Sequence, residues 1–502
     1  MKTINALIAP PGAGKTTWLI NHLNTNKNNH SIIAFPTKLL SAEVQCRLTA
    51  INLRYNAIDS NNIDGSVTQC LEASLLHRTD KIVICTHESL RLINADTLQG
   101  WHLYIDEIPT TWDCDTLSFS ELSYRAALDQ YAEIDEEHNN RLKIKADFKQ
   151  LAKDLASQST SALSNEARKL LKALLDDRYI IEVDELDAKQ IRTVRIIGVK
   201  HYIPAFEAAE STVIMGAEIE KTLLGVILKG AGWRVKSIES SLDFKGYENK
   251  VTIHPFLAAN QTYSKRTALV KNGKFQEHYE EGCILDDWLK YDVFKIIGNR
   301  KAILVAHSWC DPALPLIQDG QSTNIARPSI DSRGINEYDN YNIAICLQHG
   351  NLTPVESSRS TPTLAALLSL EHPIDNNDIL SAIKYERFYE STLQSVCRTA
   401  LRSRNNEEDI LLFVQDHDIA KFLCSKIEDC TIDDSHSVHV TKEDSEAKIK
   451  RDKLKLTAIT LNDLGYGINF IAEQIGRSER TVRNWLKAYL QLEAMQVSQA
   501  GN

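Results

Sequence analysis

A glycine-rich string near the start of the chain has the residue types needed to bind phosphate. The string APPGAGKTT occupies residues 9–17, between a short apolar strand pattern and a helical pattern, with alanine where the simplest phosphate-loop pattern has its first glycine. Glycines let the backbone turn so that successive N–H groups face a phosphate, and the following helix N-terminus adds positive potential. The string therefore predicts a nucleotide site made of Pro11, Gly12, Ala13, Gly14, Lys15, Thr16 and Thr17.

Two carboxylates at the end of a later strand would complete this site. The string LYIDEIP places Asp106 and Glu107 directly after apolar residues. In a parallel sheet this position lies at the same edge as the phosphate loop. We expect Lys15 to reach the β- and γ-phosphates of ATP, the Thr16 hydroxyl and Asp106 to hold Mg²⁺, and Glu107 to act as general base toward the attacking water.

The elements around these residues alternate between strand and helix. Strand patterns such as SIIAFPT and KIVICTH are separated by helical ones, which predicts an α/β fold with parallel sheets. Leucines at helical spacing between residues 148 and 175 predict a mainly helical insertion. We expect a first RecA-like block at 1–112 plus 211–235, the helical insertion at 113–210, a second RecA-like block at 236–425, and a small all-α unit at 450–502.

Composition limits the classes of protein that this chain can belong to. Its 502 residues are 43% hydrophobic and suit several domains, and a net charge of −10 argues against a protein that coats nucleic acid with a basic surface. The ten cysteines form no CxxC pair, so we expect buried thiols rather than a zinc site or disulfide framework. No apolar run reaches membrane-spanning length, and we expect a cytoplasmic protein without a membrane partner.

Further strings, in order along the chain, resemble the motifs of superfamily-two helicases of the DEAD and DEAH type. FPTKLLSAEVQ (35–45) and CTHESL (85–90) are similar to their strand-gripping motifs, which implies nucleic-acid contacts at Pro36, Thr37, Lys38, Thr86 and His87. IMGAE (214–218) stands at the motif that couples hydrolysis to domain movement, although the family usually has S-A-T there. ILVAHS (303–308) resembles motif IV.

The last two motifs imply nucleotide contacts from the second block. SRGIN (332–336) resembles motif V and implies contacts at Gly334 and Asn336, and QSVCRTALR (394–402) resembles motif VI and implies that Gln394, Arg398 and Arg402 face ATP. The second arginine lies one residue later than is usual in the family, which leaves Arg402 and Arg404 as alternatives for the outer finger. A guanidinium supplied across a cleft suits the charge on a transferring phosphoryl group. Within the superfamily, THESL, DEIP and MGAE are similar to strings of viral origin-binding replication helicases.

The C-terminal residues 468–490 resemble a helix-turn-helix of the resolvase or transposase kind. Gly476 suits the turn and Ser478 the N-cap of a second helix. The residues expected to pack the two helices together are Ile471, Ala472, Ile475, Val482, Trp485 and Leu486. The opposite face would present Arg480, Arg483, Asn484 and Lys487 to DNA phosphates and base edges.

Three functions are compatible with these patterns. The leading hypothesis is an ATP-dependent DNA helicase or translocase that acts, with other replication proteins, on a plasmid, phage or mobile element. A packaging or remodelling ATPase is the second, but the nuclease carboxylate cluster that it would want is missing from the second half of the sequence. The third is a DNA-binding regulator switched by ATP, and Glu107 counts against it because a switch needs no general base.

Overall fold

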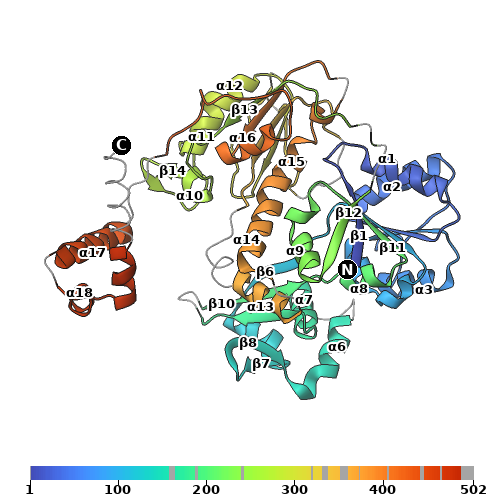
Figure 1. The fold of residues 1–502 in the computed structure, drawn as a ribbon, viewed down its shortest axis with the longest axis horizontal. Helices are drawn as coiled ribbons and strands as arrows, with labels where there is room; N and C mark the ends of the chain where they lie inside the picture. Colours follow the sequence, from blue (N-terminus) through green and yellow to red (C-terminus); the bar gives the residue numbers. More distant parts are fainter. Residues whose placement is uncertain are drawn as a thin grey trace.

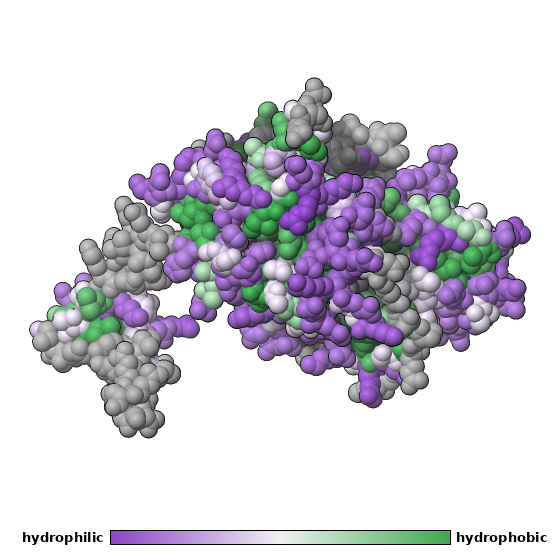
Figure 2. All heavy atoms as spheres, turned by 90° about the horizontal axis from the view of Figure 1, so that it is seen from above, coloured by the Kyte–Doolittle hydropathy of each residue, from purple (hydrophilic) through white to green (hydrophobic). Residues whose placement is uncertain are grey.

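A computed structural model describes most of the chain. The described residues are 2–157, 164–186, 190–238, 242, 244–317, 320, 322–330, 337–350, 360–371, 374–403, 406–440, 446–463 and 466–487. Among them, no helix has both the length and the apolar character needed to cross a bilayer. Hydrophilic residues cover most of the face shown in Figure 2.

The first block is built on a parallel sheet of seven strands. Its order, β12-β1-β11-β5-β2-β4-β3, places the strand before the phosphate loop two positions from the strand that ends at Asp106. β2 and β4 are short, β-branched and almost fully buried, because helices cover both faces of the sheet. The strands are β1 (Lys2–Ile8), β2 (Ser31–Phe35), β3 (Asn56–Ala57), β4 (Ile82–Thr86), β5 (His102–Asp106), β11 (Ser211–Gly216) and β12 (Trp233–Ser237).

Helices cover this sheet on two sides. α1 (Lys15–Thr25) and α2 (Lys38–Ala50) pack on one face, where Leu19, Leu23 and Val44 join a single apolar cluster. The opposite face buries Leu71, Leu90 and Phe206 from other helices. Those helices are α3 (Val67–His77), α4 (His87–Leu92), η1 (Ala95–Leu98), α8 (Ile203–Ala208), η4 (Ile219–Lys221) and α9 (Leu223–Gly230).

The insertion between β5 and β11 is not mainly helical, so that prediction is wrong. It contains an antiparallel sheet in the order β6-β10-β9-β8-β7, seen in Figure 1 beside α6 and α7. One face is covered by α7, whose Leu170 and Leu174 pack on the sheet, while β6 alternates between half-buried and exposed residues. Such half-polar strands are harder to recognise than leucines at helical spacing. The elements are β6 (Trp112–Ser120), α5 (Glu121–Tyr124), η2 (Arg125–Asp129), β7 (Ala132–Asp135), β8 (His138–Ile144), η3 (Ala146–Phe148), α6 (Lys149–Ser157), α7 (Asn165–Leu174), β9 (Tyr179–Val183) and β10 (Ile191–Val199).

The second block has its own parallel sheet, which confirms the predicted α/β class. The strand order is β17-β16-β18-β19-β13-β20, and β20 lies beyond residue 425, where the sequence interpretation ended this block. An isolated parallel β-bridge pairs Leu257 with Val438, so the second block continues further along the chain. The strands are β13 (Val251–Pro255), β16 (Ala302–Ala306), β17 (Ile325–Ala326), β18 (Ile343–Leu347), β19 (Ile410–Val414) and β20 (Cys430–Ile432), with a separate hairpin of β14 (Val270–Lys271) and β15 (Lys274–Phe275).

Two helices of the second block reach across to the insertion. In Figure 1, α14 and α13 run from the second block down to β10. Leu364 and Ile379 lie in one apolar cluster with Ile197 of the insertion and Leu223 of the first block, so this cluster joins all three parts. The helices of the second block are α10 (Lys265–Ala268), α11 (Ile284–Trp288), η5 (Leu289–Val293), α12 (Phe294–Ile297), α13 (Thr361–Glu371), α14 (Asn376–Lys384), η7 (Tyr385–Glu390), α15 (Ser391–Val396), η8 (Ala400–Arg402) and α16 (His417–Cys424).

The C-terminal unit stands apart from the main body in Figure 1. It consists of α17 (Glu446–Asp463), α18 (Ile468–Ile475) and a helix over residues 479–487. Gly476 ends α18 with a φ of 62°, and the Ser478 hydroxyl accepts a hydrogen bond from the Thr481 amide at 3.3 Å. The residues expected to pack the short helices are in contact, and they share a cluster with Ala458 of α17: Ile471, Ala472, Ile475, Val482 and Leu486 are buried and Trp485 is half-buried.

Two cysteines are paired, which corrects the expectation of thiols throughout. Cys424, at the end of α16, forms a disulfide with Cys430 at the start of β20. Their spacing of six residues matches no familiar sequence pattern, and the turn between α16 and β20 brings them together. The other eight cysteines are free, and five of them are buried: Cys85, Cys283, Cys310, Cys346 and Cys397.

Glu218 links the two blocks through a half-buried set of hydrogen bonds. It follows β11 of the first block and accepts from the Tyr385 hydroxyl at 2.6 Å and from Lys426 Nζ at 2.8 Å, both in the second block. Burial by itself would raise the pKa of Glu218, but hydrogen bonds from Lys426, Tyr385 and Lys221 outweigh it and bring the pKa to about 2. The ionised carboxylate is therefore stabilised in the folded state.

We predict that Glu218→Gln lowers the free energy of unfolding by about 1–3 kcal/mol at pH 7, as expected for lost hydrogen bonds to a charged group. Because the folded pKa lies below the ordinary value of 4.5, this contribution is complete above pH 4.5 and disappears as the pH falls toward 2. Chemical denaturation at several pH values measures it. The matched control is Glu220→Gln, which changes an exposed glutamate two residues away. An equal loss in the control would contradict the role of Glu218.

Candidate functional site

The phosphate loop leaves β1 and enters α1 through two left-handed glycines. Gly12 has a φ of 80° and Gly14 a φ of 86°, a region that side chains rarely adopt. Gly14 is also the N-cap residue of α1 and provides no side-chain cap, so amides of the first turn remain available to a ligand. The observed loop therefore has the backbone shape that the sequence predicted.

The side chain of Lys15 folds back onto the phosphate loop. Its Nζ donates to the carbonyl oxygens of Ala9 and Pro10, each at 2.9 Å. Burial lowers the pKa of Lys15, while the nearby carboxylate of Asp106 raises it. An incoming phosphate would offer this ammonium group a stronger acceptor than the two carbonyls.

The two predicted carboxylates meet the loop at the end of β5. Asp106 is only 2% exposed, and the Thr16 hydroxyl donates to its Oδ2 at 3.3 Å. Burial, and next the neighbouring Glu107, raise the pKa of Asp106 to about 7. The chain leaves the strand with Glu107 at a φ of 62°. Adjacent hydroxyl and carboxylate oxygens are the donors that a hard cation such as Mg²⁺ prefers, so Thr16 and Asp106 fit that ion.

Residues from the second block close the other side of the same cavity. Gln394 on α15, Arg398 and Arg402 line a cavity of about 460 Å³ together with Lys15, Thr16, Asp106 and Glu107. That volume lies within the range of small-ligand sites. Tyr247, also in the second block, donates from its hydroxyl to the Pro11 carbonyl at 2.8 Å. The structure thus brings together residues that are far apart in the sequence.

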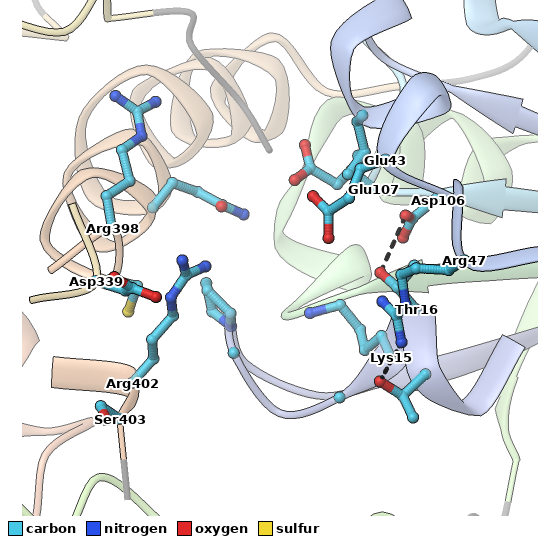
Figure 3. Close-up of a pocket in the computed structure, with 17 residues that line it drawn as sticks. Lys15, Thr16, Glu43, Arg47, Asp106, Glu107, Asp339, Arg398, Arg402 and Ser403 are labelled. Carbon is cyan, nitrogen blue, oxygen red and sulfur yellow. Dashed lines mark hydrogen bonds between the residues drawn. The ribbon is translucent and has the colours of Figure 1, made fainter. Parts of the chain in front are cut away.

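The two arginines occupy different positions. In Figure 3, Arg402 extends toward the phosphate loop, and its Cβ would lie 2.7 Å from a Cβ added at Gly12. The guanidinium of Arg398 points away from Lys15. Arg398 is 5% exposed and donates to the carbonyls of Ser329 and Ile330 at 3.0 and 3.1 Å. A phosphate contact by Arg398 would therefore require its guanidinium to turn.

Sequence reasoning missed several residues that line this cavity. Glu43 and Arg47 project from α2, and Arg47 donates from Nη2 to the Thr17 hydroxyl at 2.8 Å. With Leu40 they follow the i, i+3, i+7 spacing of one helix face, which could have indicated a shared surface. Asp339 and Ser403 also line the cavity, and no local pattern marks them.

The residues predicted to grip a nucleic-acid strand have varied environments. The side chain of Thr37 caps α2, and that of Thr86 caps α4. Lys38 is exposed and donates to Asn61 Oδ1 at 2.9 Å, and Pro36 beside it is half-buried. His87 is 7% exposed, and a 3.0 Å hydrogen bond joins its Nε2 to the carbonyl of Asp106. Its side chain therefore contacts the backbone at the end of β5. Gly334, Asn336 and Arg404 lie outside the described residues.

Comparisons with known proteins give distant likenesses. No family model and no curated protein matches this chain. Among solved structures, the XPD apo structure is 13% identical with a TM-score of 0.49, covering 87% of this chain and 97% of the other. The structure of S. tokodaii Xpd4 is 11% identical with a TM-score of 0.46, covering 86% of this chain and 96% of the other. The structure of S. cerevisiae Dbp5 bound to RNA and ADP BeF3 is 9% identical with a TM-score of 0.36, covering 88% of this chain and 86% of the other. At these identities and TM-scores the likenesses establish no activity for this chain.

We predict that Gly12→Ala lowers the free energy of unfolding more than Gly232→Ala does. The two glycines have φ values of 80° and 76°, so both variants carry the left-handed strain of about 1–2 kcal/mol. Only at Gly12 would the new Cβ meet another residue, since nothing lies within 4 Å of the one at Gly232. Chemical denaturation compares the two variants.

A second substitution isolates the contact with Arg402. In a protein that carries Arg402→Gly, which removes the opposing Cβ, adding Gly12→Ala should cost no more than Gly232→Ala costs in the wild-type protein. Equal losses in the two single variants would show that the second block does not press on the phosphate loop.

Proposed function

We propose that this protein is an ATP-dependent motor of the helicase type that acts on DNA. The observation that carries the proposal is the shared cavity, in which a phosphate loop and a carboxylate pair from one block face a glutamine and two arginines from another. A triphosphate held there would contact both blocks at once. This arrangement suits a nucleotide whose hydrolysis changes how the blocks fit together.

The residues of the first block would bind the phosphates and activate water. Lys15 would exchange its carbonyl partners for phosphate oxygens, and the amides of the phosphate loop would hold the rest of the chain of phosphates. Glu107 would take a proton from the attacking water as the water oxygen bonds to the γ-phosphorus and the bond to the ADP oxygen breaks. Mg²⁺, carried by Thr16 and Asp106, would neutralise phosphate charge.

The second block would supply the remaining positive charge. Arg402 already lies against the loop, and Arg398 would reach the γ-phosphate after leaving the carbonyls of Ser329 and Ile330. Because these arginines belong to the other block, hydrolysis would depend on how closely the blocks approach. Glu218 is hydrogen-bonded to Tyr385 and Lys426 of the second block, and this direct contact would couple movements of the two blocks.

The C-terminal unit would deliver the motor to DNA as a helix-turn-helix. Arg480, Arg483, Asn484 and Lys487 are all exposed on the helix over residues 479–487, while Val482 and Leu486 bury its other side. A basic helix presented this way suits the major groove. The setting that we propose is replication of a plasmid, phage or mobile element. A regulator that uses ATP only as a switch is the alternative, and the position of Glu107 in the cavity favours hydrolysis over it.

We predict that Lys15→Ala and Glu107→Gln both abolish ATP hydrolysis, but that only Lys15→Ala greatly weakens ATP binding. Lys15 pairs with phosphate charge in the bound state, whereas Glu107 acts on the water. Calorimetric titration with ATP and a phosphate-release assay, each with and without single- and double-stranded DNA and RNA, measure the two properties. Glu210→Gln, which changes an exposed glutamate directly before β11, is the control. Near-normal turnover in Glu107→Gln would refute its assignment as the base.

For the C-terminal unit, we predict that Arg483→Ala combined with Lys487→Ala weakens binding to duplex DNA and flattens its salt dependence. Each lost phosphate contact removes roughly 0.9 units of the log–log slope. Fluorescence anisotropy of the full chain at several salt concentrations measures this effect, and ATP hydrolysis without DNA should survive. Lys455→Ala removes a charge from α17 instead and should leave the slope unchanged. A slope that is the same in the pair and the control would contradict the DNA-binding role.

A further inference from the structure

A second hollow adjoins the phosphate loop. It has a volume of about 600 Å³ and shares Gly12, Gly14 and Thr17 with the cavity described above. A Cβ added at Gly12 would meet Arg402, whereas one added at Gly14 would approach Leu242 at 4.0 Å. The loop thus lies between these two side chains. The other residues that line the second hollow are Ala13, Trp18, Asn21, His22, Thr25, Asn26 and Leu242.

The wall of this hollow contains an aromatic ring that is held in place. The indole of Trp18 stacks on the imidazole of His22 one turn later, with ring centres 4.8 Å apart and planes inclined by 16°. A 3.1 Å hydrogen bond joins His22 Nε2 to the Tyr104 hydroxyl. Burial lowers the pKa of His22, which favours the neutral form of the supporting ring. Trp18 and Leu242 both pack at the margin of the same apolar cluster.

The position of the terminal phosphate limits where the rest of a nucleotide can lie. Lys15, Asp106 and Glu107 would fix the γ end inside the first cavity, so the ribose and base must leave at the opposite end, past Thr17. Beyond the phosphate loop, the first cavity is lined largely by charged groups, including Glu43, Arg47 and Asp339. The second hollow instead offers the indole of Trp18, the aliphatic Leu242 and the amide of Asn21. Flat apolar faces with polar edges are what a nucleobase requires.

We propose that the second hollow binds the base of the nucleotide, with the base between Trp18 and Leu242 and the Asn21 amide at its polar edge. This inference rests on the proposed ATPase function and names the residues that select the base. Leu242 belongs to the segment that joins the two blocks, so an occupied base site would link that segment to the nucleotide. Asn21 is exposed and lies on the same helix as Lys15, which fixes its distance from the phosphates.

Calorimetric titration with ATP and with tripolyphosphate separates the base from the phosphates. Trp18→Ala should weaken ATP binding about tenfold or more, the scale of one lost base–aromatic stack, and leave tripolyphosphate binding unchanged. Trp18→Phe should restore most of the ATP affinity. Asn21→Ala, at an exposed position, should reduce the preference for ATP over GTP without changing tripolyphosphate binding.

The possible results distinguish this inference from the proposed function. Equal effects of Trp18→Ala on ATP and tripolyphosphate, or no effect on either, would overturn the base site. Arg47→Ala could instead lose affinity for ATP but not for tripolyphosphate, while Trp18→Ala keeps normal affinity for both. That result would place the base beside α2 and would also overturn the base site. If the wild-type protein bound neither ligand, or if Lys15→Ala bound both normally, the proposed function itself would fail and the base site with it.

Discussion

The contact between the phosphate loop and Arg402 is the constraint on which the rest of the structure depends. Gly12 has no side chain, and its left-handed backbone lets the second block approach so closely that a Cβ could not fit. The cavity is therefore complete only when both blocks are in place. A loop built on one block alone would lack the arginines that we propose to stabilise charge during phosphoryl transfer.

Further contacts hold the second block in this position, and each involves a different part of the molecule. The Tyr247 hydroxyl bonds to the loop itself, and Glu218 bonds to Tyr385 and Lys426 beside β11. Farther away, Thr363 of α13 donates to Glu182 of the insertion at 2.9 Å. Glu182 in turn pairs with Arg195, which is bound at 2.6 Å by both oxygens of Asp184. Because the buried charges of Glu182 and Arg195 are paired and hydrogen-bonded, they give the insertion a specific docking surface for α13.

Charge is distributed to match these roles. The chain has a net charge of −10. The cavity is lined by four basic and four acidic residues, and the last helix that the structure describes exposes Arg480, Arg483 and Lys487. Asp106 is buried and Lys15 is half-buried, and each is stabilised in its charged form by the other, while burial favours the neutral forms. Such a balance makes the site sensitive to added charge, which a triphosphate and its cation would bring.

The sequence by itself determined the local chemistry of this protein. Gly12, Gly14, Lys15 and Thr16 act within one turn of chain, and Asp106 and Glu107 follow one strand, so neighbouring residues define their geometry. The α/β class also followed, because apolar strands alternate with helices. The tertiary structure alone decided how distant segments meet. The antiparallel sheet of the insertion, the Cys424–Cys430 disulfide, the partners of Glu218 and the positions of Arg47 and Trp18 beside the loop all arise from contacts between elements, and spacing along one element cannot encode those.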